Sequence, residues 1–185
     1  AAPALNVLSS YGEKLPGKYA LVVRPEIMTK KVGPSSHSCS AHSYPIDARA
    51  SFKESATATV ARLVETLASV EIPLTASQLK AGQYRGQIVV KAEEYDPRLN
   101  FIAGFWSGRA SSTVDLSASV QVDGPDGRLL GTKVSESRTV EGEAGGCGEG
   151  TDALARANSK AMEAVLDRLA ERVSNEPRLR TAALP

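Results

Sequence analysis

Two cysteines carry the most specific chemistry in this sequence. Cys39 and Cys147 are the only cysteines, and most of the chain separates them. Each lies in a polar loop ahead of a predicted amphipathic helix, and two helices packed on one face of a sheet would bring such loops close together. An even cysteine count is typical of a structural disulfide in a protein of an oxidising compartment. The sequence therefore predicts a Cys39–Cys147 disulfide and, with it, an exported protein.

A metal site is the alternative use of the same region. His37, Cys39 and His42 lie within one short stretch, and Cys147 could supply a fourth ligand. Imidazole nitrogens and thiolates are the ligand types that zinc prefers, but this spacing matches no standard zinc module. The disulfide is therefore preferred, and two unrelated free thiols are the remaining alternative.

The sequence offers little for catalysis. His37 and His42 are the only histidines, and Asp47 lies in the same loop. A serine–histidine–aspartate site is conceivable, but the Gly-x-Ser-x-Gly motif that presents a nucleophilic serine is absent. No pair of carboxylates stands out from the charges expected on solvated faces. We predict a protein that is not an enzyme and that uses no cofactor.

A glycine-rich loop, Gly142–Gly150, leads directly into the second predicted helix. Backbone amides at a helix N-terminus can bind an anion, so the alternative function is a small-ligand or anion-binding module at the helix N-termini around Cys39 and Cys147. A phosphate-binding loop would end in Gly-Lys-Ser/Thr, whereas here no lysine follows. Glu143 and Glu149 would also repel a phosphate. A strand-to-helix connection shaped around a disulfide is the preferred interpretation.

The segment from Arg98 to Arg109 contains the residue types that are common at protein–protein interfaces. It holds the only tryptophan and two of the three phenylalanines. Tryptophan and arginine are enriched among the residues that dominate binding energy at protein interfaces. The apolar side chains could instead fold under the sheet edge as a small satellite core. We predict a partner-binding surface made of Arg98, Phe101, Ile102, Phe105, Trp106 and Arg109.

Length and composition are those of one soluble globular domain. The chain has 185 residues, 42% hydrophobic and 23% charged, with a formal net charge of +1. Such a balance provides no basic surface for nucleic acid, and no apolar run approaches the roughly 20 residues that span a bilayer. We expect an N-terminal arm over residues 1–17, a single domain over 18–175 and a C-terminal tail over 176–185.

Hydrophobic periodicity predicts the elements that position these residues. Apolar side chains recur at helical spacing in two segments, Ser51–Val70, with Ser51 and Glu54 as a capping pair, and Thr151–Val173. Apolar runs or alternation predict strands at Lys18–Arg24, Gln87–Tyr95 (ended by Asp96 and Pro97), Val114–Val122 and Arg128–Val140. The order is β-α-β-β-β-α. It predicts an α+β two-layer sandwich, with a mainly antiparallel sheet and two helices on one face.

This element order resembles that of the small envelope lipoproteins of Gram-negative bacteria with a TolB-N-terminal-domain-like fold. The group includes accessory lipoproteins of lipopolysaccharide assembly, curli secretion and exopolysaccharide export. The resemblance rests on Lys18–Arg24, Ser51–Val70, the hairpin of Val114–Val122 with its Asp-Gly turn, and Thr151–Val173. The loops of Cys39 and Cys147 are not a general feature of the group.

The resemblance implies a non-enzymatic accessory protein of the cell envelope, periplasmic or associated with the outer membrane, that acts through protein–protein contacts. Other envelope proteins would be its partners. The chain could also assemble with copies of itself, and an N-terminal lipid could tether it to a membrane. No nucleic acid is expected as a partner.

Overall fold

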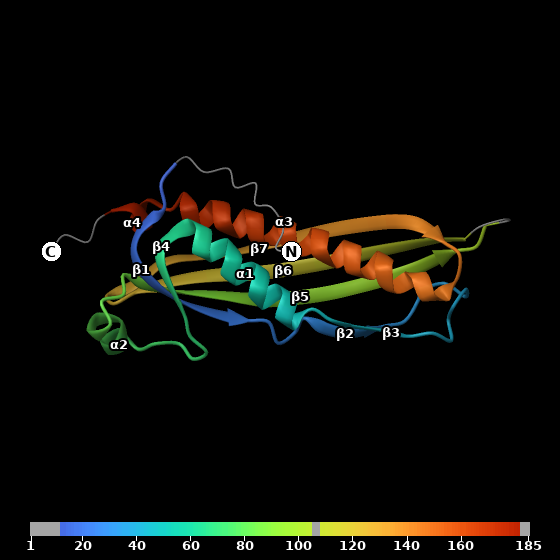
Figure 1. The fold of residues 1–185 in the computed structure, drawn as a ribbon, viewed down its shortest axis with the longest axis horizontal. Coiled ribbons are helices and arrows are strands. Elements are labelled where there is room, and N and C mark those ends of the chain that lie inside the picture. Colours follow the sequence, from blue (N-terminus) through green and yellow to red (C-terminus); the bar gives the residue numbers. More distant parts are fainter. Residues whose placement is uncertain (1–11, 105–107, 182–185) are drawn as a thin grey trace.

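Three long strands and two helices make up most of the molecule (Figure 1). The computed structural model describes residues 12–104 and 108–181. The long elements are α1 (Arg49–Leu63), β5 (Gly86–Ile102), β6 (Gly108–Gly124), β7 (Gly127–Ala144) and α3 (Gly150–Ser174). The shorter ones are β1 (Leu15–Arg24), β2 (Thr29–Val32), β3 (Tyr44–Asp47), β4 (Val64–Ser69), α2 (Ala76–Ala81), a 3-10 turn (Cys147–Glu149) and α4 (Pro177–Arg180).

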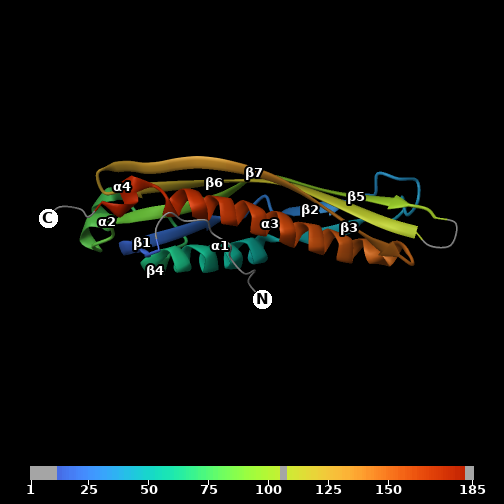
Figure 2. The same cartoon turned by 90° about the horizontal axis from the view of Figure 1, so that it is seen from above.

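The main sheet has five strands in the order β4-β1-β5-β6-β7. Strand β1 runs parallel to both β4 and β5, whereas the long strands β5, β6 and β7 are antiparallel to one another. A separate two-stranded sheet joins β2 to β3. Helices α1 and α3 cover one face of the main sheet side by side, which the two views show together (Figures 1 and 2). The predicted α+β sandwich with two helices on one face is confirmed.

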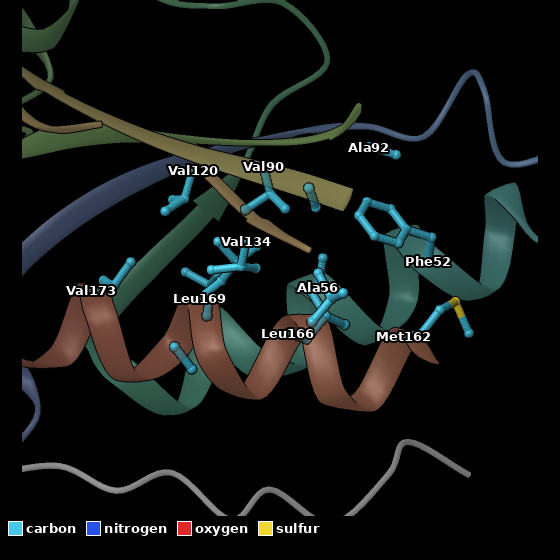
Figure 3. Packing of buried hydrophobic residues seen from close by; sticks show 14 of the residues in the cluster. Phe52, Ala56, Val90, Ala92, Val120, Val134, Met162, Leu166, Leu169 and Val173 are labelled. Atoms are coloured by element: carbon cyan, nitrogen blue, oxygen red, sulfur yellow. The ribbon is translucent and has the colours of Figure 1, made fainter. Parts of the chain in front are cut away.

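The main core fills the space between these two layers. Strand β6 alternates as predicted, because its even-numbered residues from Ala110 to Val122 are buried against the helices while most of their neighbours are partly exposed. The apolar stripe of α3 is also buried as predicted, at Leu154, Ala157, Ala161, Val165, Leu169 and Val173. Figure 3 shows how Phe52 and Ala56 of α1 and Leu166 of α3 face Val90 and Val120 of the sheet.

The first helix differs from its prediction at both ends. It begins at Arg49, and its N-cap Ala48 makes no side-chain capping bond, so the capping role of Ser51 and Glu54 is not observed. It ends at Leu63, after which Val64–Ser69 forms strand β4. Leu67 keeps the helical spacing of the apolar residues of α1. It nevertheless lies in a strand, because β4 pairs with β1 and such sheet pairing overrides a local periodicity.

The second predicted strand also continues past its expected end. β5 passes through Asp96 and Pro97 to Ile102. Strand β1 pairs with β5 only as far as Lys91, so Pro97 lies in a stretch where the side of β5 away from β6 has no continuous partner in the described chain. A proline that cannot donate a hydrogen bond is tolerated at such a strand edge.

The ends of the domain are more structured than the sequence suggested. β1 begins at Leu15, within the expected arm, and α4 forms within the expected tail. Leu179 of α4 is fully buried in the main core, so this short helix belongs to the packed body. Within the described residues, no helix has both the length and the hydropathy to cross a membrane.

Candidate functional site

One end of the sheet collects most of the residues that the sequence singled out. We call it the stapled end: the loop between β2 and β3 (residues 33–43), the adjoining ends of β5 and β6, and the turn before α3. Cys39 and Cys147 form a disulfide there, with their Cα atoms 5.6 Å apart. The predicted pairing is therefore present. Cys39 lies between β2 and β3, however, so strand β3 intervenes between it and the first helix.

Tyr44 packs at the centre of the stapled end. Its ring lies 6.0 Å from that of Phe101, and its hydroxyl donates a hydrogen bond to the carbonyl oxygen of Cys147. A Cβ atom at Gly150 would lie only 2.7 Å from Leu99 and 2.8 Å from Phe101, so only a glycine lets α3 begin this close. This packing is a second core, separate from the main one, made of Val32, Tyr44, Leu99, Phe101, Ala110, Ala144, Ala153 and Leu154.

The disulfide loop is also fixed to the edge of β5. The Ser35 N–H donates to the Leu99 carbonyl oxygen at 3.0 Å, and the Phe101 N–H donates to the Ser36 hydroxyl at 3.0 Å. Pro34 forms an isolated parallel bridge with Leu99. These bonds occupy backbone groups of β5 beyond the reach of β1, so the loop completes the sheet edge at this end.

The predicted partner-binding residues divide between the two faces of the sheet. Phe101 is buried in the second core, as the satellite-core alternative expected for this segment. Ile102 has 51% of its surface exposed and is paired in register with Arg109, which is also exposed. Arg98, four residues earlier on β5, is exposed and forms an ion pair with Asp115. Phe105 and Trp106 lie outside the described residues.

The two cysteines of the alternative metal site are bonded to each other. Cys39 and Cys147 are joined in the disulfide, so neither sulfur is a thiolate. His37 and His42 are both exposed, and His42 stacks on the Tyr44 ring. In the part of the chain that the structure describes, no three His, Cys, Asp or Glu side chains are arranged to hold a metal ion.

Asp47 has a different partner from the one a catalytic triad requires. Its carboxylate accepts hydrogen bonds from the Arg49 side chain, at 2.6 and 2.9 Å. This hydrogen bonding to Arg49 lowers the pKa of Asp47 to about 2. Asp47 is thus held as a carboxylate by an arginine at the start of α1.

The glycine loop already contains an acceptor for one of its own amides. The Gly145 N–H donates to the Glu149 carboxylate at 2.7 Å. An anion binding at this turn would have to displace that carboxylate or approach beside it, and like charges repel. The arrangement therefore does not favour the alternative anion site near Cys147.

The role of Tyr44 was not predicted from the sequence. Tyr44 sits in the long polar loop, between a serine and a proline, with no periodic pattern around it. Its only signal is the aromatic side chain itself, which is costly to expose in a polar segment. Its packing partners Phe101 and Leu154 come from β5 and α3, far away in the sequence.

Comparison with known proteins identifies a fold and no family. No family model and no curated protein matches this sequence. A putative neuraminyllactose-binding hemagglutinin homolog from Helicobacter pylori is similar in structure, with a TM-score of 0.50 and 8% identity over 93% of this chain and 97% of that chain. A Xanthomonas campestris protein of the DUF330 family aligns with a TM-score of 0.48 and 14% identity over 92% and 91% of the two chains.

PelC from Paraburkholderia phytofirmans, solved as a dodecamer, aligns with a TM-score of 0.37 and 9% identity over 91% of this chain and 93% of that chain. All three neighbours come from Gram-negative bacteria. At this level of identity the Helicobacter pylori comparison shows a shared α+β fold and assigns no activity.

Proposed function

We propose that this protein is an exported accessory protein of the Gram-negative cell envelope, without catalytic activity, that binds other proteins through the stapled end. The observation that carries the proposal is Ile102. It is a large apolar side chain, 51% exposed, at the end of strand β5 in the β5–β6 hairpin, and the edge of β5 is fixed there to a disulfide-linked loop. An exposed apolar side chain on a rigid base is suited to fill a pocket in a partner.

The disulfide supports the exported location. A disulfide persists in the periplasm and is rare in the reducing cytosol. The Cys39–Cys147 link spans 108 residues and joins two loops that are otherwise far apart in the sequence. A link of this kind therefore supports maturation of the chain in an oxidising compartment.

The rigidity of the stapled end supports binding rather than catalysis. Phe101 and Tyr44 pack beneath the hairpin, and Ser35 and Ser36 fix the neighbouring loop to β5. Contact residues that are ordered before binding lose less conformational entropy when the partner arrives. Exposed Arg98 and Arg109 on the same strands supply charged groups around Ile102.

Self-assembly and a lipid tether belong to the same proposal. Strand β7 pairs with β6 along its length, and no described strand pairs with its outer edge. A free strand edge is a template for pairing with another chain, so a second copy could add there. The proposed tether through an N-terminal lipid rests on the resemblance to envelope lipoproteins alone.

Site-specific photo-crosslinking tests the contact. A photoreactive residue at position 102 should form specific adducts with an envelope protein or a second copy in intact cells. Ile72 is the matched control, because it is 76% exposed and lies in the connection between β4 and α2, away from the stapled end. The proposal is wrong if position 102 gives no adducts, or gives the same adducts as position 72.

A further inference from the structure

A hollow of about 310 Å³ lies at the end of the molecule opposite the stapled end. It is an open hollow bordered by the turn between β6 and β7, by the residue that precedes β5 and by α4, which all meet at this end (Figure 1). Three arginines line it, together with Asp126, Leu129 and Thr181. We call it the arginine hollow, after Arg85, Arg128 and Arg178.

Cationic side chains outnumber acidic ones around the arginine hollow. The arginine hollow brings together three guanidinium groups from three separate segments, and one acid, Asp126, lines it with them. Two more acids lie beside it, because Asp123 forms an ion pair with Arg128 and Glu176 forms one with Arg178. Asp126 is itself paired with Lys80, at 3.4 Å. With Lys80 included, four cationic groups stand against three acids, so an anion in the hollow would meet a local surplus of one positive charge.

Each arginine is held in place by a bond that leaves donors free. Arg85 donates from one terminal nitrogen to the Thr181 carbonyl oxygen. Arg128 donates from Nε to Asp123, and Arg178 from Nε to Glu176, each at 2.8 Å. Arg128 also donates from a terminal nitrogen to the Gln121 side chain at 3.4 Å. A guanidinium has five N–H donors in a rigid fork, so these bonds orient the groups and leave most donors for a ligand.

The backbone beneath the arginines is fixed as well. Gly17 has a φ of +93°, and a Cβ there would lie 3.2 Å from the Arg85 side chain, so this glycine lets the arginine stem lie against β1. The α4 turn that carries Arg178 is anchored by buried Leu179 and by Arg180, which donates to carbonyl oxygens of Glu13 and Ser174. The site is thus preorganised.

We propose that the arginine hollow binds a phosphomonoester group. Arginine forks match phosphate oxygens in pairs of parallel hydrogen bonds, and a dianionic phosphate offers three terminal oxygens to three guanidinium groups. A hollow of about 310 Å³ exceeds the size of a phosphate alone and matches the lower range of small-molecule sites. The organic part of the ligand lies against Leu129 at the rim.

Two sources can supply this chemistry, a soluble sugar or glycerol phosphate and the phosphate of an anionic lipid headgroup. Direct titration of the full-length protein distinguishes them. One arm uses glycerol 3-phosphate and inorganic phosphate, followed by calorimetry and thermal unfolding. The other arm uses vesicles of phosphatidylcholine with and without phosphatidic acid, followed by co-sedimentation. Chloride at matched ionic strength is the reference in both arms.

We expect saturable binding in at least one arm, and a raised unfolding temperature if the soluble ligand binds. Arg178→Gln and Arg128→Gln should each weaken this binding about tenfold, because each removes charge-assisted hydrogen bonds. The matched control is Arg62→Gln, which removes an exposed arginine from the last turn of α1, outside the hollow. Circular dichroism of each variant checks that the fold is retained.

Three results would overturn the proposal: no binding in either arm, binding that equal ionic strength of chloride abolishes, or an equal loss in Arg62→Gln and Arg128→Gln. Arg128 lies on β7 and Arg178 on α4, so the comparison of Arg128→Gln with Arg62→Gln does not use the variant that could loosen α4. The crosslinking experiment at position 102 probes the opposite end, so the two proposals can fail independently.

Discussion

The Tyr44 hydroxyl donates a hydrogen bond to the carbonyl oxygen of Cys147, the residue whose sulfur is bonded to Cys39. The β2–β3 hairpin is therefore joined to the start of α3 twice, once covalently and once by a side chain at its base. The tyrosine is buried, and burial raises the pKa of its hydroxyl, which keeps it a hydrogen-bond donor at neutral pH. This double attachment makes the stapled end a firm base for the exposed Ile102.

Replacing Cys39 and Cys147 together by serine should lower the free energy of unfolding by about 2–4 kcal/mol, because the link closes a long loop. Chemical denaturation of the variant and of the wild type measures the difference. Hydrogen exchange should also rise in residues 33–43 more than in α3. Equal stability of the oxidised and reduced wild type would contradict this prediction.

Gly150→Ala should destabilise the protein by about 1–3 kcal/mol, the usual cost of overpacking a close-packed site. The backbone at Gly150 is helical, so the cost comes from contact with Leu99 and Phe101 and not from backbone strain. Gly148→Ala is the matched control, because a Cβ there meets nothing within 4 Å. Thermal unfolding of the two variants should therefore differ, and a neutral Gly150→Ala would refute the packing described here.

Tyr95→Phe should cost about 1–2 kcal/mol, because the Tyr95 hydroxyl donates to the Asn158 side chain at 2.8 Å and its loss leaves a buried amide oxygen unpaired. Adding Asn158→Leu to this variant should recover most of the loss, since both polar groups are then removed. A double-mutant cycle from denaturation curves tests the pair. Additive effects would show that the two residues are not coupled.

The free energy of unfolding should decrease at acidic pH, and protonation of Glu136 should account for part of the decrease. The Arg168 side chain, at 2.7 Å, lowers the pKa of Glu136 and outweighs the effect of its burial. Because the folded pKa lies below that of the unfolded chain, this carboxylate stabilises the fold above its unfolded pKa of about 4.3. The contribution is lost as the pH falls through the lower, folded pKa.

Glu136→Gln should therefore reduce the free energy of unfolding by about 1 kcal/mol near neutral pH and have less effect at a pH below both pKa values. Unfolding temperatures of the variant and the wild type across this range measure the difference. Glu141→Gln, on the same strand but exposed, is the control. A difference that stays constant with pH would exclude the ion pair as its origin.

Much of the architecture was predictable because local patterns were strong. The alternation of Val114–Val122 and the apolar stripe of Thr151–Val173 each define one buried face, and the structure buries both. The disulfide was predictable for another reason: with two cysteines there is only one possible pairing, and the loops were long enough to meet.

The ends of other helices and strands depended on contacts between distant segments, which a local sequence pattern does not predict. Val64–Ser69 carries on the apolar spacing of α1, and only pairing with β1 makes it a strand. Pro97 is typical of a strand break, yet β5 continues through it because a proline, which has no backbone N–H, is tolerated at that strand edge. Phe101 is buried and Ile102 exposed because β5 alternates at a point that the sequence suggested was already outside the strand.

The sequence by itself thus determined the helix stripe, the central alternating strand and the cysteine pair, since each follows from residue types at short or unique spacings. Only the tertiary structure decided the two ends of the molecule. Tyr44 meets Phe101 at one end, and Arg85, Arg128 and Arg178 meet at the other. Each of these groups comes from segments far apart in the chain, and their meeting depends on strand order and register, which short-range periodicity does not encode.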